Sequence, residues 1–421
     1  MNISLKNRRM VTSFTAIYLL LVIVNSIKEY TLTLLMGRYG KLVFAMITIP
    51  ILIHMASRYK QRFRFKNKIT GIVVLSLVII FSIYYVLSTG DTERLLYNLA
   101  LPVYLLFYFF LSKNVLFVTY KLVKDALYGH SKIWLLTIFQ KVLFFNLFFW
   151  FAIAFATGMN MADEDGFGGF FQDKVHFGLY TATGFLVCFY LRYNKVKRDR
   201  SIYNLLQLAI YVMLAFVTSR NALLIIFTAV FSYVVITKAQ KTVSILLLLL
   251  FPLSLFYLDT FFYNVSGDQI NSFSTGRWEI WRIAWVEIVD KGVFFGSGIF
   301  NINNTVLYNN LGTGFHYLDT LEFLFLHSSY LEILAGGGMI TLILFLVIVV
   351  SSWNLFSNMD KAVMIAILFG GIGESYLAQP FMLISTLFYL ILIINNHQLV
   401  VRNMMRKKQL LPKEPKLEVY A

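Results

Sequence analysis

The sequence predicts an all-α polytopic membrane protein, and three observations lead to that prediction. Of the 421 residues, 58% are hydrophobic, and only 14% are charged, whereas soluble domains carry about 25% charged residues. Apolar runs such as IVVLSLVII and SILLLLLF recur along the chain, and a helix is the way such a run satisfies its backbone inside a bilayer. Basic residues gather between the runs, as they do in membrane proteins.

The apolar runs predict about twelve membrane spans, several of them completed by tilt and by the residues at their ends. We expect the whole chain, 1–421, to form a single integral membrane unit. The spans are expected near residues 11–27, 40–56, 69–87, 95–111, 133–157, 175–191, 202–218, 221–237, 242–259, 334–352, 361–378 and 381–397.

The distribution of charge predicts how the chain is threaded. Basic residues concentrate in the loop SRYKQRFRFKNK, in RYNKVKRDR and in the tail at 398–421, whereas GMNMADEDGFGGFFQDK is acidic. If both termini are cytoplasmic, most of the 37 basic residues lie inside, as the positive-inside rule requires. The net charge of +16 therefore does not call for nucleic acid. This topology leaves one large loop, 260–333, on the outer side between spans nine and ten.

The segment STGRWEIWRIAWVEI, 274–288, is the most polar and aromatic part of that outer loop. Its helix-start residues are Ser274, Thr275 and Gly276, and its tryptophans are Trp278, Trp281 and Trp285. One interpretation is an amphipathic interfacial helix whose tryptophans lie on one stripe at the headgroup level. The other is an anion site, because free N–H groups at a helix start and the Arg277 guanidinium would converge on one phosphate. The two interpretations are compatible.

Two further charged residues are placed near predicted span ends on the outer side. Arg220, in VTSRNALL, is expected in a short turn, where it either reaches lipid headgroups or holds a substrate. Glu374, in FGGIGESYLAQP, is a functional candidate because of its depth, and it could pair with an arginine.

His327, in LHSSYLEILAGGGMI, is the strongest candidate for a proton acceptor. A single histidine is often an ordinary polar residue, but the unperturbed pKa of a histidine side chain, near 6.5, suits a general base. His176 and His316 are weaker candidates on the same side. The glycines that follow His327 predict a kinked helix, or the close approach of another segment. No outer spacing suggests a metal site, and the lone Cys188 is expected to serve packing.

Taken together, these motifs resemble the bacterial O-antigen polymerase and O-antigen ligase family. The resemblance is carried by TSRNALL, by STGRWEIWRIAWVEI with FFGSGIF after it, and by HSSYLEILAGGGMI, in that order. Family members commonly have Ser-Gly-Arg where this chain has Ser-Thr-Gly-Arg. They often have asparagine at the position of His176, which leaves the role of His176 open.

The resemblance implies an inverting glycosyltransferase that uses undecaprenyl-diphosphate-linked sugars at the outer face of the bacterial plasma membrane. It implies that Arg220 and Arg277 hold the donor diphosphate and that His327 activates the acceptor hydroxyl. Arg282 would be a second donor contact or would face lipid headgroups. Arginine would supply the positive charge, so neither a metal nor another cofactor is expected.

Several functions stay open at this stage. A polymerase of O-antigen, capsule or exopolysaccharide repeat units is our preferred hypothesis, acting with a chain-length regulator and a flippase as partners. A ligase that transfers finished glycan to lipid A core or to protein shares the same donor chemistry. A lipid-linked oligosaccharide flippase would instead show charges or broken helices at mid-depth, and a receptor or assembly protein is a further alternative.

Overall fold

The computed structural model describes residues 5–25, scattered positions within 72–87, and then 128–158, 161–163, 166–171, 173–194, 199–238, 277–290, 293–298, 325–379 and 382–410. The predicted spans at 40–56, 95–111 and 242–259 lie outside these residues. The helices are α1 (Leu5–Asn25), α6 (Tyr128–Ala156), α7 (Lys174–Tyr193), α8 (Ile202–Thr218), α9 (Arg220–Lys238), α12 (Arg277–Asp290), α14 (Ser329–Ser352), α15 (Asn358–Gly370) and α16 (Leu383–Leu410), with short 3-10 turns η1 (Trp353–Leu355) and η2 (Tyr376–Ala378).

The described structure is mostly helical, as the sequence predicts. Among the described residues, three helical segments are long and apolar enough to cross a membrane: Lys132–Ala156, Arg220–Thr237 and Ser329–Leu355. Shorter apolar helices cover Thr15–Val24, Ile202–Thr218 and Leu383–Asn396. A polytopic helical membrane protein agrees with these segments. The number of twelve spans and the orientation of the chain stay predictions.

Two local features differ from the predicted all-α pattern. In the acidic loop, two short strands pair in antiparallel fashion, β1 (Ala162–Asp163) with β2 (Gly166–Phe167). The predicted span at 361–378 is not one helix. Its helix α15 ends at Gly370, where the glycines of the GGIG run let the chain leave the helix, and the turn η2 follows.

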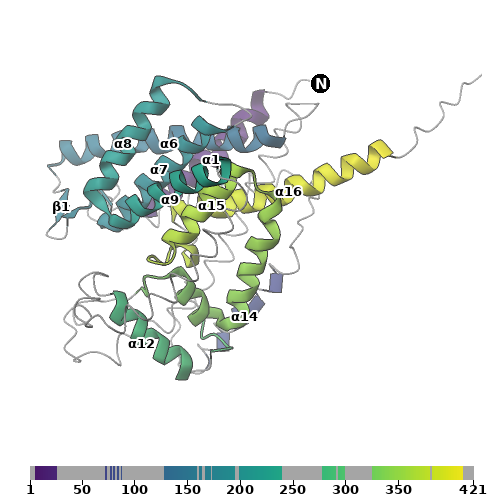
Figure 1. Cartoon of the computed structure of the whole chain (residues 1–421). Helices are drawn as coiled ribbons and strands as arrows, with labels where there is room; N and C mark the ends of the chain where they lie inside the picture. Colours follow the sequence, from purple (N-terminus) through teal and green to yellow (C-terminus); the bar gives the residue numbers. More distant parts are fainter. Residues whose placement is uncertain are drawn as a thin grey trace, which may run out of the picture.

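The helices α1, α6, α7, α8, α9 and α15 gather in one bundle (Figure 1), with α7 buried along nearly its whole length. Two glycines on α7 let neighbouring helices approach closely. The position of a Gly178 side chain is filled by Ser219, and that of Gly184 by the ring of Tyr211. Helix α12 lies apart from the bundle beside α14 (Figure 1), and the two share a small core of their own.

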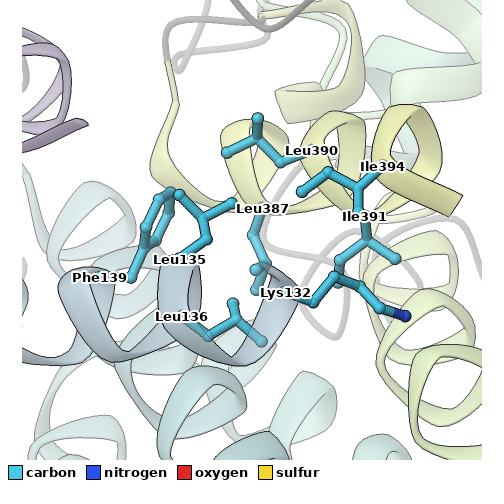
Figure 2. Close-up of a pocket in the computed structure, with 8 residues that line it drawn as sticks. All are labelled: Lys132, Leu135, Leu136, Phe139, Leu387, Leu390, Ile391 and Ile394. Atoms are coloured by element: carbon cyan, nitrogen blue, oxygen red, sulfur yellow. The ribbon is translucent and has the colours of Figure 1, made fainter. Parts of the chain in front are cut away.

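A buried charge cluster ties four helices of the structure together. Lys132 Nζ on α6 lies 2.5 Å from Asp360 Oδ2 on α15 and 2.8 Å from Asn395 Oδ1 on α16. The Tyr190 hydroxyl on α7 donates to Asp360 Oδ1 at 3.0 Å, and Ser357 forms a capping box with Asp360. Figure 2 shows a narrow cavity beside this cluster, lined by Lys132 and by apolar residues of α6 and α16.

Candidate functional site

The candidate site lies where the ends of three helices meet. Asn221, near the start of α9, donates through Nδ2 to the carbonyl of Gly370 at the end of α15 (3.3 Å). The backbone N–H of Ser329, the first residue of α14, lies 2.8 Å from the carbonyl of Gly371 and 3.0 Å from that of Glu374. The first residues of α9 and α14 are therefore held against the loop that follows α15.

The carboxylate of Glu374 joins two residues that lie far away in the sequence. Arg277 Nη2, at the start of α12, is 2.5 Å from Glu374 Oε1. His327 Nδ1 is 3.4 Å from the other oxygen, Oε2. The Glu374 side chain is 7% exposed, against 22% for Arg277 and 27% for His327. The carboxylate is therefore shielded from water, whereas its two partners remain accessible to a ligand, and charges interact more strongly in such a place than on an open surface.

A second carboxylate, Glu332, holds the backbone on either side of this site. Glu332 is fully buried on α14. Its Oε1 accepts the Leu326 N–H at 2.8 Å and the Ser375 hydroxyl at 3.3 Å. Leu326 precedes His327 and Ser375 follows Glu374, so this one oxygen fixes both segments that carry the site. Sequence reasoning missed Glu332, although a carboxylate inside the apolar stretch YLEIL was a visible signal.

His327 has an unusual backbone conformation that helps to aim its side chain. Its φ is +48°, and no other non-glycine residue among those described has a positive φ. This left-handed conformation is unfavourable for a side chain and persists where neighbouring contacts impose it. Here the Trp281 indole donates to the Leu326 carbonyl at 2.8 Å, and Ser328 caps α14.

The glycine run in α14 breaks the helix, as the sequence predicts. Gly338 has φ +69° and ψ −179°, and the freed backbone groups pair with the segment 293–298. The hydrogen bonds are Ser297 N–H to Ala335 O (2.9 Å), Gly298 N–H to Gly336 O (2.8 Å) and Met339 N–H to Val293 O (2.9 Å). Side chains at Gly296 or Gly338 would overlap the backbone of the facing segment. The segment after α12 is thus fastened to α14.

The remaining candidate residues have different positions. Arg220 is the first residue of α9, is exposed, and forms no ion pair with another described residue. It follows Ser219, which packs on Gly178 of α7. Arg282 pairs instead with Glu279 one turn away on the same helix, and this hydrogen bond raises the pKa of the Arg282 guanidinium.

His176 serves the start of α7 in this structure. Its Nδ1 lies 2.7 Å from Asp173 Oδ2, and its backbone N–H donates to Asp173 Oδ1, the cap of the helix. Burial raises the pKa of the Asp173 carboxyl, but the hydrogen bonds and charge of His176 outweigh burial and lower that pKa overall. The ring nitrogen facing Asp173 is thus occupied within its own helix.

The tryptophans of α12 differ in exposure, and their position at lipid headgroups stays a prediction. Trp281 is partly buried and bonded to Leu326, whereas Trp285 is 48% exposed. The buried face of α12 is instead formed by Ile280, Ile283, Ala284 and Ile288, so Trp281 lies at its edge and Trp285 outside it. Trp278 is partly buried. Ser274, Thr275, Gly276 and His316 lie outside the described residues.

The arrangement offers a positive group, a nitrogen base and a carboxylate in one place. Within the described ranges, no three side chains of histidine, cysteine, aspartate or glutamate gather in a way that could hold a metal ion. The guanidinium of Arg277 could bind an anion through its remaining N–H groups. The imidazole of His327 has its Nδ1 turned to Glu374, which leaves Nε2 to take a proton.

Comparison with known families shows a match over the central part of the chain. Residues 204–346 match the model of the family described as O-antigen ligase. The matched segment contains Arg220, Arg277, Arg282 and His327 and ends before Glu374. Neither the curated proteins nor the solved structures give a match. The resemblance of this chain to the O-antigen polymerase and ligase family is confirmed by the match of residues 204–346 to the model described as O-antigen ligase.

Proposed function

We propose that this protein is a glycosyltransferase that polymerises lipid-linked polysaccharide repeat units at the outer face of the bacterial plasma membrane. The observation that carries the proposal is the Glu374 carboxylate, which joins Arg277 to His327. A cation for the leaving group and a base for the acceptor are the two groups that glycosyl transfer from a diphosphate needs. The family match over 204–346 supports this chemistry and does not favour a flippase.

The donor would be a glycan linked to undecaprenyl diphosphate, and the acceptor a sugar hydroxyl of another lipid-linked repeat unit. The acceptor oxygen attacks the anomeric carbon of the donor while the bond from that carbon to the phosphate oxygen breaks. The electron pair of the broken bond leaves with the lipid diphosphate, and the hydroxyl proton moves to His327 Nε2. Attack opposite the leaving group inverts the anomeric configuration.

The two arginines have separate tasks in this scheme. Arg277 would bind the diphosphate with its free N–H groups and stabilise the negative charge that develops on it. Arg220, the first residue of α9, would contact the second phosphate of the same diphosphate. A lysine cannot replace the planar guanidinium at a site that binds two oxygens at once.

The decisive test of this chemistry is Arg277→Lys in a strain that lacks the native gene. We expect the variant to accumulate in the membrane at the normal level and to make no polymer. Arg282→Lys is the matched control on the same helix, because Arg282 is already paired with Glu279, and it should keep most of the activity. A strain that makes full-length polymer with Arg277→Lys would refute the assignment.

The outer location of the site needs a separate test. In a Cys188→Ala background, single cysteines in α12 and at 293–298 should react with a membrane-impermeant thiol reagent. The reagent is added to cells whose outer envelope is permeabilised and whose plasma membrane is intact. Labelling only after the plasma membrane is broken would reverse the proposed topology of twelve spans with cytoplasmic termini.

A ligase is the second candidate function, because the matched family carries that description. The two functions differ in what a deletion strain accumulates. Loss of a polymerase leaves single lipid-linked repeat units, whereas loss of a ligase leaves completed polymer on its lipid carrier.

A further inference from the structure

We infer that Glu374 is a positioning residue that couples the arrival of the lipid diphosphate at Arg277 to the activation of His327. The inference rests on the function proposed above and adds to it an order of events. Donor binding comes first and prepares the base, and the acceptor hydroxyl is activated only afterwards.

The contacts of Glu374 are unequal. Its Oε1 makes a short ion pair with Arg277 at 2.5 Å, whereas Oε2 and His327 Nδ1 are 3.4 Å apart, beyond an ordinary hydrogen bond of about 2.9 Å. In this arrangement the carboxylate is therefore engaged mainly with the arginine. A movement of well under about 1 Å would bring it into a full hydrogen bond with the imidazole.

Such a movement requires only side-chain rotation, because the backbone around it is fixed. The carbonyl of Glu374 accepts hydrogen bonds from the backbone N–H of Ser329 (3.0 Å) and from its hydroxyl (2.5 Å). Glu332 holds Leu326 and Ser375 on either side of the site. The backbones that carry the histidine and the carboxylate thus keep their positions while the carboxylate turns between its two partners.

Binding of the donor diphosphate would move the Glu374 carboxylate away from Arg277. A diphosphate competes with Glu374 for the Arg277 guanidinium and repels the carboxylate, since both are anions. The nearest alternative partner of Glu374 is His327. Among the described residues, Glu374 is the charged group that faces the imidazole, and Arg277 lies on the other oxygen of the same carboxylate. Glu332 holds the neighbouring Leu326 and Ser375 through its Oε1.

A stronger contact with Glu374 has two effects on His327. It keeps the proton on Nδ1, so that Nε2 is the free base, and it stabilises the imidazolium that forms when the acceptor proton is taken up. Without donor, Glu374 remains on Arg277 and the base is weaker.

The coupling predicts that Glu374→Gln increases the affinity for the donor diphosphate and decreases the rate of glycosyl transfer. The neutral amide competes less for Arg277, so undecaprenyl diphosphate should bind several-fold more tightly to the purified full-length variant in lipid nanodiscs. The transfer rate should nevertheless fall by about 10²-fold, the scale of a general base that has lost its activation. A residue with only a structural role would weaken both. Glu279→Gln is the matched control, since it removes a carboxylate paired with Arg282, and it should change neither quantity.

The reactivity of His327 gives the direct test. Modification of His327 by diethyl pyrocarbonate, followed by mass spectrometry over a range of pH, reports the pH at which the imidazole becomes neutral. Undecaprenyl diphosphate should raise this midpoint in the wild type, and should raise it much less in Glu374→Gln, where only the phosphate charge acts. Glu374→Asp should recover part of the wild-type shift because it retains the negative charge.

The possible failures are distinguishable. If the lipid diphosphate binds through Arg277 but shifts His327 equally in wild type and in Glu374→Gln, the coupling is refuted and the proposed function stands. Weaker binding together with slower transfer in Glu374→Gln would also refute the coupling. If undecaprenyl diphosphate does not bind, or binds equally to Arg277→Ala, both the coupling and the proposed function are refuted.

Discussion

Replacing either member of the buried Lys132–Asp360 pair should destabilise the protein, and by unequal amounts. The Asp360 side chain is 0% exposed and that of Lys132 8%. Breaking such a pair by removing one partner costs about 3–5 kcal/mol, because the other charge stays buried without compensation. The cost depends on which hydrogen bonds the remaining charge keeps.

The structure indicates which substitution is worse. After Asp360→Asn, the Lys132 ammonium retains the Asn395 side-chain oxygen at 2.8 Å as its neutral partner. We expect a cost at the upper end, about 5 kcal/mol. After Lys132→Met, the Asp360 carboxylate still accepts from Tyr190 at 3.0 Å and from the Ser357 hydroxyl and N–H at 2.7 and 2.9 Å. We expect a cost at or below the lower end, about 3 kcal/mol.

The double variant, Lys132→Met with Asp360→Asn, removes both charges and should be more stable than Asp360→Asn alone. The measurement is the midpoint of thermal unfolding of the full-length protein in detergent, followed by tryptophan fluorescence. We expect the unfolding midpoint to decrease in the order wild type, Lys132→Met, the double variant and Asp360→Asn. The midpoints of Lys132→Met and of the double variant should be close to each other. Losses that simply add in the double variant would show that the two residues are not coupled, and would refute the reasoning.

Three more predictions concern the site and its supports. Glu332→Ala should lower transfer activity strongly and reduce the free energy of unfolding by about 1–3 kcal/mol, because two hydrogen bonds are lost. Glu332→Gln keeps an acceptor oxygen and should retain most of the activity, so equal losses of activity in the two variants would refute a positioning role. Gly338→Ala should prevent folding around α14, because its β-carbon would overlap the backbone of Phe294. Gly158→Ala has a similar positive φ but open space around it, so it should cost only about 1–2 kcal/mol, and the amounts of the two variant proteins in the cell test this difference. The pKa of Asp173 is lower in the folded protein than in the unfolded chain, so the ionised carboxylate stabilises the fold above about pH 4, and this stabilisation is lost as the pH falls through the lowered pKa. The difference in unfolding midpoint between wild type and Asp173→Asn should therefore shrink below about pH 4. A difference that stays constant with pH would contradict the assignment.

Most of the described helices could be predicted from the sequence. The predicted spans 202–218 and 221–237 coincide with α8 and α9 to within one residue. Hydropathy succeeds here because the length of an apolar run bounded by polar residues predicts the length of the helix, and its apolar content predicts burial in protein or lipid. The break in α14 was predictable for a similarly local reason, since three consecutive glycines weaken a helix wherever they occur.

The internal order of the site could not be predicted in the same way. Arg277 and Glu374 are separated by 97 positions, and no local pattern states which arginine a buried carboxylate will meet. Glu332 looks in sequence like an ordinary acidic residue in the first turn of a helix, and its role depends on two backbone segments that fold against it. Hydropathy also extended the span at 361–378 past Gly370, because it measures apolar content and not the conformation of glycines.

The broken helix α14 has a consequence for how the protein is made. In lipid, the freed carbonyls of Ala335 and Gly336 and the freed N–H of Met339 would be costly until residues 293–298 pair with them. We therefore expect completion of this span during biogenesis to depend on the docking of residues 293–298, the segment that follows α12. A newly synthesised chain with a damaged loop would present an unfinished span to the proteases of the membrane. We expect substitutions in 293–298 to be detected first as a lower amount of protein in the cell, so that membrane quality control removes incomplete sites before they can act.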